Sequence, residues 1–258
     1  AKYHPQSRPP YCEAEAVDRM IALAKAAGRA PLYIVHVSAK ESVNLIREAR
    51  KAGDTVFGET CPQYLVLDES RYDDPVEGLK FILSPPLRAK EHQEAIWQGI
   101  KDGTLQVIAT DHCSFDFHGD KQNGKDDFTK CPPGVETRMP IVFSEGVSKG
   151  RLSLNEFAAV TSTNPAKIFG MYPKKGVLAP GSDADIVLMN PDMEVTITKN
   201  ILHENVDYTP YEGIQVKGWP VMTMVRGQAV VENERLQVPL GFGRYINRKP
   251  VKYTELLK

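Results

Sequence analysis

Apolar runs alternate with helical patterns along the first two thirds of the chain, and this alternation restricts the fold more than any other feature. Apolar residues recur at helical spacing over residues 13–28, 40–53 and 89–103. Short apolar runs of the kind that form strands lie at 31–39, 55–67, 81–88 and 105–115. Strands that alternate with helices predict a parallel sheet or barrel covered by helices. We therefore expect an α/β fold, with the continuously apolar run 31–39 buried on both faces.

The pattern changes after the last of these runs. Two further helical patterns cover residues 135–150 and 152–170. From Gly176 onward, short strand-like runs are separated by turn residues. This change predicts a small β segment appended to the α/β part.

Charge and composition exclude several classes of function. The chain has 32 Lys and Arg against 33 Asp and Glu, a net charge of -1, so neither a nucleic acid nor a membrane surface is an expected partner. No apolar stretch approaches the roughly 18 residues of a membrane span. The four cysteines are far apart and form no C-x-x-C pair, which predicts reduced thiols and a cytoplasmic location.

Polar side chains follow each predicted strand at the point where the apolar run ends. They are His36 and Ser38, then Glu59, Cys61 and Gln63, then Ser84, and finally Asp111 and His112. In a parallel α/β barrel the chemistry gathers at the carboxyl ends of the strands. Four consecutive ends with polar groups therefore favour an enzyme over a purely structural domain.

Each candidate also has a simpler interpretation. His36 is either a metal ligand or a buried histidine with a hydrogen-bond partner, and residue type alone favours the second. Asp111 follows the apolar "VIAT", where a carboxylate needs a metal or a partner, but it could equally cap the next loop. Asp111 and His112 point to opposite faces of an extended strand, which argues against a metal site made from this stretch alone. Ser84 is expected to be a substrate contact or a turn residue, since no nucleophile motif surrounds it.

Several motifs together resemble the dihydropyrimidinase and D-hydantoinase family of metal-dependent amidohydrolases. They are "YIVHVSAK", "GETCPQYL", "LSPPLR", "TDHCSF", "GVETRM", "TSTNPAKIFGMYPKKGVLAPGSDADIV" and "VRGQAVVE". The resemblance runs in order along nearly the whole chain, but it covers only the second half of a family member. It implies the second half of a (β/α)8 TIM-type barrel at residues 1–175, strands of a β-sandwich at 176–232, and a tail at 233–258 used in subunit contacts of a homotetramer.

The resemblance also implies a role for three residues. His36 would ligate one of two divalent metal ions. Asp111 would ligate the other and act as the base that transfers a proton. The backbone of Ser84 would contact the substrate. The remaining ligands, including a carboxylated lysine, are expected upstream of Ala1. Zinc is the expected metal because it suits mixed histidine and carboxylate ligation, with manganese or cobalt as alternatives.

The implied activity is the hydrolytic ring opening of cyclic diamides. The small-molecule substrate would be a 5,6-dihydropyrimidine or a 5-substituted hydantoin, opened to an N-carbamoyl amino acid. One departure concerns "KCPPGVETR" at 130–138, which is several residues shorter than the family pattern and lacks its substrate-binding asparagine. We assign no substrate contact there.

Two alternatives remain open. Allantoinases and dihydroorotases usually carry a histidine where Gln63 stands, which weighs against those activities. A non-catalytic assembly protein of the same fold typically replaces the residues that correspond to His36 and Asp111. This sequence keeps both, which favours an active enzyme.

Overall fold

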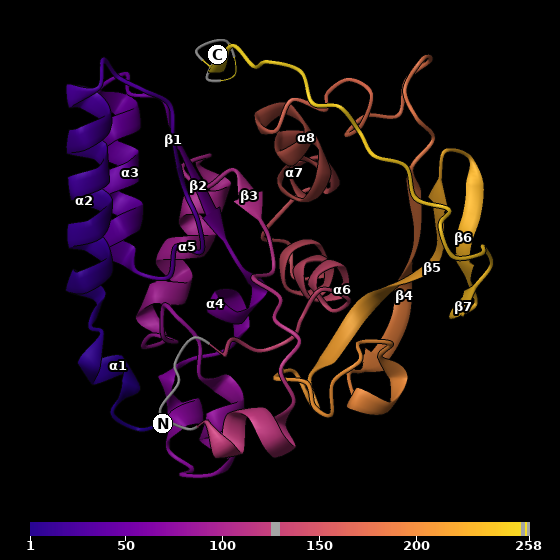
Figure 1. The fold of residues 1–258 in the computed structure, drawn as a ribbon, viewed down its shortest axis with the longest axis horizontal. Helices are drawn as coiled ribbons and strands as arrows, with labels where there is room; N and C mark the ends of the chain where they lie inside the picture. Colours follow the sequence, from indigo (N-terminus) through magenta and orange to yellow (C-terminus); the bar gives the residue numbers. More distant parts are fainter. Residues whose placement is uncertain (125–129, 254–255, 257–258) are drawn as a thin grey trace. The chain divides into compact units, whose positions relative to one another are not determined.

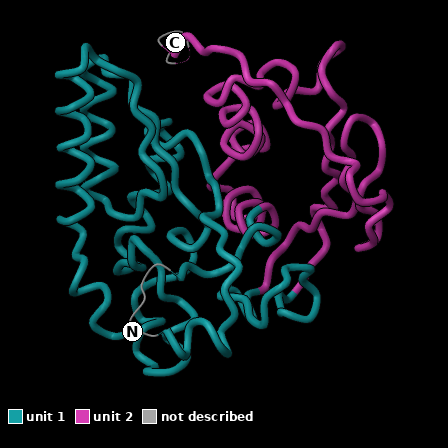
Figure 2. The backbone as a smooth tube through the Cα atoms, viewed as in Figure 1, with its two compact units in different colours: residues 1–138, 196–214 teal, residues 139–195, 215–258 magenta. Residues whose placement is uncertain are grey.

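The computed structural model describes residues 1–124, 130–253 and 256, and these residues form two compact units. Unit 1 comprises residues 1–138 and 196–214, and unit 2 comprises residues 139–195 and 215–258 (Figure 2). The predicted boundaries after residues 175 and 232 do not coincide with this division and remain predictions. Residues 254, 255, 257 and 258 of the predicted tail lie outside the described part of the chain.

Unit 1 contains the predicted parallel sheet. Its strands are β1 (Leu32–Ile34), β2 (Val56–Thr60) and β3 (Val107–Ile108), in the order β1-β2-β3 with both pairings parallel. The register sets Tyr33 opposite Phe57 and Thr60 opposite Ile108. The α/β prediction is therefore confirmed for this part of the chain.

Three amphipathic helices lie beside this sheet (Figure 1). They are α2 (Pro10–Ala26), α3 (Lys40–Lys51) and α5 (Glu91–Lys101), close to the predicted ranges. The first two are followed by Gly28 at φ 77° and Gly53 at φ 83°, a backbone region in which glycine is the favoured helix stop. The apolar faces of α3 and α5 form much of the core, with Ile46 and Ile96 both fully buried.

The remaining helical segments of unit 1 are short. They are α1 (His4–Ser7), α4 (Pro62–Val66), η1 (Glu69–Tyr72), η2 (Glu77–Phe81), η3 (Phe117–Lys121) and η6 (Lys199–Ile201). The second half of the strand-like run 55–67 is instead the helix α4, which starts at Pro62, a residue whose missing N–H costs nothing in a first helical turn. Within the described residues, no helix combines the length and the apolar character needed to cross a bilayer.

Two expectations about strands were wrong. Residues 81–88 form no strand, because two consecutive prolines, Pro85 and Pro86, cannot donate to a ladder. The run 31–39 is not buried on both faces: β1 is half-buried throughout, and Val35 is 45% exposed. This strand is at an edge of the three-stranded sheet, which leaves part of it uncovered.

Unit 2 combines helical segments with an antiparallel sheet. The helical segments are α6 (Arg138–Val142, whose first residue belongs to unit 1), η4 (Phe143–Ser148), α7 (Leu154–Ala158), η5 (Ala159–Thr163) and α8 (Asn164–Ile168). The sheet has the order β4 (Ile186–Thr196, whose last residue belongs to unit 1), β5 (Gln215–Val225), β6 (Gln228–Glu232) and β7 (Arg235–Leu236). A tight turn at 226–227 joins β5 to β6. The β segment predicted after Gly176 is therefore present.

Candidate functional site

The carboxyl ends of the three parallel strands bring the two predicted metal ligands to one edge of the sheet. His36 lies two residues after β1, and Asp111 lies three residues after β3. Since neighbouring strands are about 4.8 Å apart, the ends of β1 and β3 are separated by about 10 Å, with β2 between them. Both side chains are partly exposed, so a ligand can reach them.

Both of these residues have an unusual backbone conformation. His36 has φ 41° and Asp111 has φ 51°, in the left-handed region that residues other than glycine rarely adopt. Such a conformation costs of order 1 kcal/mol or more, and strained residues of this kind are enriched at functional sites. Four other non-glycine residues, Arg29, Arg226, Asn233 and Glu234, share it at turns or bends elsewhere in the described chain. Its occurrence at both predicted ligands is a backbone feature that the two strand ends share.

Glu59 fills the position between them at the end of β2. Its carboxylate accepts a hydrogen bond from the Tyr33 hydroxyl, with 2.6 Å between Tyr33 Oη and Glu59 Oε2, and another from the backbone N–H of His36. Burial raises the pKa of Glu59, and these two hydrogen bonds partly offset that effect. Burial and the nearby carboxylate also raise the pKa of Tyr33, so its hydroxyl keeps its proton and remains a donor.

The backbone before Asp111 is held by buried side chains. Gln63 Nε2 donates to the carbonyl oxygen of Thr110 at 3.2 Å, while Gln63 Oε1 accepts from the Tyr211 hydroxyl at 3.2 Å. Arg138 Nη1 donates to the carbonyl oxygen of Ile108 at 2.9 Å. Gln63 is therefore occupied by structural contacts on both sides of its amide.

The segment that carries Ser84 is fixed by side chains instead of a strand ladder. Carbonyl oxygens at four positions accept hydrogen bonds from side chains far away in sequence. The pairs are the Tyr72 hydroxyl with Phe81 at 3.1 Å, Lys121 Nζ with Ile82 at 2.9 Å, His4 Nε2 with Leu83 at 2.7 Å and the Tyr64 hydroxyl with Pro85 at 2.8 Å. These bonds satisfy the buried backbone of a segment that forms no strand.

His112 is directed to a different set of partners from Asp111. Its Nδ1 accepts hydrogen bonds from the backbone N–H groups of Gly134 at 3.1 Å and Val135 at 3.3 Å. Its Nε2 is 3.0 Å from the hydroxyl oxygen of Ser114. An imidazole nitrogen that accepts two N–H groups has no lone pair left for a metal.

The donors present suit a metal ion but do not complete a site. Among the residues that the structure describes, no group of three or more His, Cys, Asp or Glu side chains is placed to hold a metal. An imidazole and a carboxylate are nevertheless the donor types that zinc and similar divalent ions prefer. The donor types of His36 and Asp111 therefore fit divalent metal ions, as two members of a larger ligand set.

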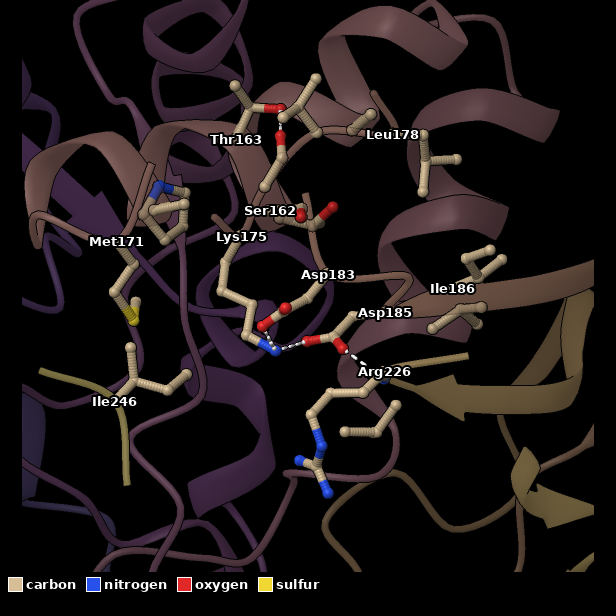
Figure 3. A pocket seen from close by; sticks show the side chains of 18 of the residues that line it. Ser162, Thr163, Met171, Lys175, Leu178, Asp183, Asp185, Ile186, Arg226 and Ile246 are labelled. Atoms are coloured by element: carbon tan, nitrogen blue, oxygen red, sulfur yellow. Dashed lines mark hydrogen bonds and ion pairs between the residues drawn. The ribbon is translucent and has the colours of Figure 1, made fainter. Parts of the chain in front are cut away.

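Unit 2 contains a cavity of about 800 Å³ whose chemistry differs from that of the strand ends. Lys175 extends between Asp183 and Asp185, 3.0 Å from Asp183 Oδ2, while Asp185 also accepts from the backbone N–H of Arg226 at 2.8 Å (Figure 3). Burial lowers the pKa of Lys175, but the hydrogen bonds that its ammonium donates to Asp185 and Asp183 outweigh this effect and raise the pKa. A lysine held charged between two carboxylates is a poor nucleophile, so this cavity is a weaker candidate.

Comparison with known proteins identifies the family. The model of the amidohydrolase family matches residues 14–230. The chain belongs to the amidohydrolase family. It is 48% identical over 259 residues to a D-hydantoinase from Geobacillus stearothermophilus and 49% identical over 252 residues to a D-phenylhydantoinase from Escherichia coli O1:K1. These alignments cover 99% and 96% of this chain but 54% of each relative.

A solved structure agrees with these relatives. The crystal structure of dihydropyrimidinase from Brevibacillus agri NCHU1002 superposes with a TM-score of 0.93 at 50% identity, covering 97% of this chain and 55% of that one. The predicted resemblance to dihydropyrimidinases and D-hydantoinases is confirmed. The chain spans about half the length of the relatives it matches.

Sequence reasoning missed several residues that shape the site of this amidohydrolase-family chain. Tyr33, Tyr211 and Arg138 were given no role, because each acts on a backbone or carboxylate group that only the folded chain brings near. Glu59 and Gln63 were noticed as strand-end polar residues, but their partners were not. The sequence offered only one signal for these five residues, which was their type. Each carries an aromatic hydroxyl, an amide or a charged group beside apolar residues.

Proposed function

We propose that these residues take part in the hydrolytic ring opening of cyclic diamides. The substrates are 5,6-dihydropyrimidines, opened to N-carbamoyl-β-amino acids, or 5-substituted hydantoins, opened to N-carbamoyl amino acids. The observation that carries the proposal is the pairing of His36 and Asp111 at the ends of β1 and β3, both in the left-handed backbone region. The names of the relatives, D-hydantoinase and dihydropyrimidinase, support the same substrate class.

The proposal includes the architecture around the site. The sheet β1-β2-β3 is part of a (β/α)8 barrel, and β4 to β7 belong to a small β-sandwich. Three parallel strands with helices beside them are consistent with such a barrel. We also propose a homotetramer with the tail 233–258 in subunit contacts, and a cytoplasmic location, where the four free cysteines remain reduced.

We assign His36 and Asp111 as ligands of two divalent metal ions, with zinc as the expected metal. When bound, such a pair supplies a strong nucleophile from water at neutral pH and polarises the amide carbonyl. The proposal requires further ligands from outside these 258 residues, a carboxylated lysine among them, since the described residues offer no group of three.

Asp111 also transfers the proton in this scheme. Its carboxylate takes a proton from the attacking water as the oxygen bonds to the carbonyl carbon, and then gives it to the ring nitrogen as the carbon–nitrogen bond breaks. The backbone at Ser84 binds the imide of the ring. Gln63 and Tyr211 keep the backbone before Asp111 in place, so that the carboxylate stays aligned for both transfers.

Replacing Asp111 tests the proposal. In the natural polypeptide that carries these residues, Asp111→Asn should lower kcat for dihydrouracil or a 5-substituted hydantoin by at least about 100-fold, since general acid–base catalysis contributes about that much. Asp18→Asn, on an exposed position of α2, is the matched control and should leave kcat unchanged. Near wild-type turnover of Asp111→Asn would refute the assignment.

A panel of cyclic ureides tests the substrate class separately. Dihydrouracil, 5-phenylhydantoin, allantoin and dihydroorotate should be assayed side by side with the same preparation. Turnover of the first two supports the proposal, and turnover restricted to allantoin or dihydroorotate contradicts it. A protein that retains metal but opens none of these rings would indicate a non-catalytic role for the same fold.

A further inference from the structure

A buried ion pair connects the two parts of unit 1 that carry His36 and Ser84. Glu13, on α2, and Arg88, four residues after Ser84, are 3.3 Å apart between Oε2 and Nη2. Their side chains are only 10% and 4% exposed. Taking two charges out of water is expensive, and an apolar pair would hold the two segments together at least as well.

The carboxylate of Glu13 fixes the residues that follow His36. Its Oε1 accepts hydrogen bonds from the backbone N–H groups of Ser38 at 3.0 Å and Ala39 at 3.1 Å. Its Oε2 accepts from the Ser38 hydroxyl. Ala39 is the N-cap residue of α3, so Glu13 binds the N–H groups of the two residues that lead directly into this helix.

All three nitrogens of the Arg88 guanidinium donate hydrogen bonds in the same network. Nε donates to the Ser38 hydroxyl oxygen at 3.0 Å, Nη2 donates to Glu13 and Nη1 donates to the carbonyl oxygen of Arg8. The planar geometry of guanidinium allows all three contacts at once, which a lysine cannot reproduce. Ser38 is thus bound from two sides, by Glu13 and by Arg88.

We propose that Glu13 and Arg88 are positioning residues that set the placement of the His36 loop relative to the Ser84 segment. Neither side chain is assigned a contact with substrate or metal. This inference rests on the proposed function, because it explains why the loop of a ligand and the loop of a substrate contact share one charged network. It predicts reciprocal effects: disturbing the pair at either end loosens both loops.

Amide hydrogen exchange of the 258-residue chain tests the coupling without any assay of activity. Glu13→Gln keeps the shape of the side chain but removes its charge. Arg88→Lys keeps the positive charge but removes the planar guanidinium that makes three contacts at once. Glu13→Gln should raise exchange at Leu87, whose N–H is bound to the Tyr72 hydroxyl and has no direct contact with Glu13. Arg88→Lys should raise exchange at the amide of Ala39.

Asp102→Asn is the matched control, because it removes a more exposed pair with Arg47 that joins α3 to the end of α5. This control should leave the hydrogen-exchange rates of the Leu87 and Ala39 amides unchanged. If Glu13→Gln raises exchange only at Ser38 and Ala39, Glu13 is a local helix cap and the inference is overturned.

Kinetics in the natural polypeptide give the second readout. Glu13→Gln should raise the zinc concentration for half-maximal reactivation of the metal-free enzyme by about tenfold, as loss of support behind a ligand does. Arg88→Lys should raise KM by about tenfold through displacement of the Ser84 segment. Partial misfolding would lower kcat but leave KM and the zinc concentration for half-maximal reactivation unchanged. If neither of these two quantities changes in either variant, the inference is overturned.

These outcomes separate the inference from the proposed function. A wild-type protein that opens no cyclic diamide contradicts the proposed function, while the exchange measurement still decides whether the two loops are coupled. An active wild-type protein whose variants behave like Asp102→Asn contradicts the inference alone.

Discussion

The side-chain amide of Gln63 donates a hydrogen bond to the carbonyl oxygen of Thr110, the residue directly before Asp111. Gln63 is 2% exposed, and its other amide atom accepts from Tyr211. Gln63→Leu should therefore lower the free energy of unfolding by about 2 kcal/mol, because it removes the partner of a carbonyl and of a buried hydroxyl. Urea unfolding followed by circular dichroism measures this change.

Gln98→Leu is the control for that substitution, since Gln98 is exposed on α5. It should change the free energy of unfolding by no more than about 0.5 kcal/mol. Equal effects of the two variants would show that the contacts of Gln63 contribute nothing specific.

The lowered pKa of Lys121 predicts that the free energy of unfolding depends on pH. Burial lowers its pKa from 10.5 to about 8, while Nζ donates to the carbonyl oxygens of Ile82 and Lys130. Between these two pKa values the unfolded chain holds more protons than the folded chain, so the contribution of Lys121 to stability rises with pH. A neutral amine still has two N–H groups, so both hydrogen bonds survive deprotonation.

Wild type and Lys121→Met should therefore be compared by urea unfolding at pH 7, 8.5 and 10. The free energy of unfolding of wild type relative to the variant should rise across this range, by at most about 1.4 kcal/mol per pH unit. Lys149→Met, at an exposed lysine, should show a constant difference. A difference that stays flat or falls for Lys121→Met would contradict the prediction.

Gly58 in β2 leaves no room for a side chain. A Cβ there would lie 2.6 Å from Leu105 Cδ2 and 3.3 Å from the carbonyl oxygen of Thr104. Gly58→Ala should lower the free energy of unfolding by about 1–3 kcal/mol, since overpacking forces neighbours to shift. Gly243→Ala, where nothing lies within 4 Å, should be nearly neutral in the same thermal or urea unfolding experiment.

Metal stoichiometry tests the ligand count. Zinc sites use three or four protein ligands, and this chain is proposed to supply two for a pair of ions. The 258-residue chain, loaded with zinc and dialysed, should retain fewer than two zinc ions per chain by mass spectrometry of the metal. His36→Ala should retain still less zinc, and two firmly held ions per chain would refute the proposed ligand set.

Much of the fold was predictable because periodicity and helix stops are local signals. The helices α2, α3 and α5 and the parallel strands between them follow from the apolar spacing and from Gly28 and Gly53. The segment 81–88 was not predictable in this way. Its apolar residues suit a strand, but its carbonyl groups bind side chains that are distant in sequence, such as His4 and Lys121.

The candidate site was likewise predictable only in part. His36 and Asp111 were singled out because each follows an apolar run and matches the family motifs, and their roles remain predictions. The contacts that shape their surroundings join residues up to 148 positions apart, as Gln63 and Tyr211 do. No local pattern encodes such pairs, so Tyr33, Arg138 and the charged pair behind Ser38 emerged only from the folded chain.

The left-handed backbone at His36 and Asp111 has a consequence for the stability of variants. Glycine, and to a lesser degree asparagine and aspartate, tolerate positive φ, so the strain is greater at His36, where φ is 41°. His36→Gly should relieve conformational energy there, and selection for heat resistance alone would then favour loss of this side chain. Under the proposed function, a thermostable variant should be screened for turnover at every round, because a stabilising change at position 36 would remove a proposed metal ligand.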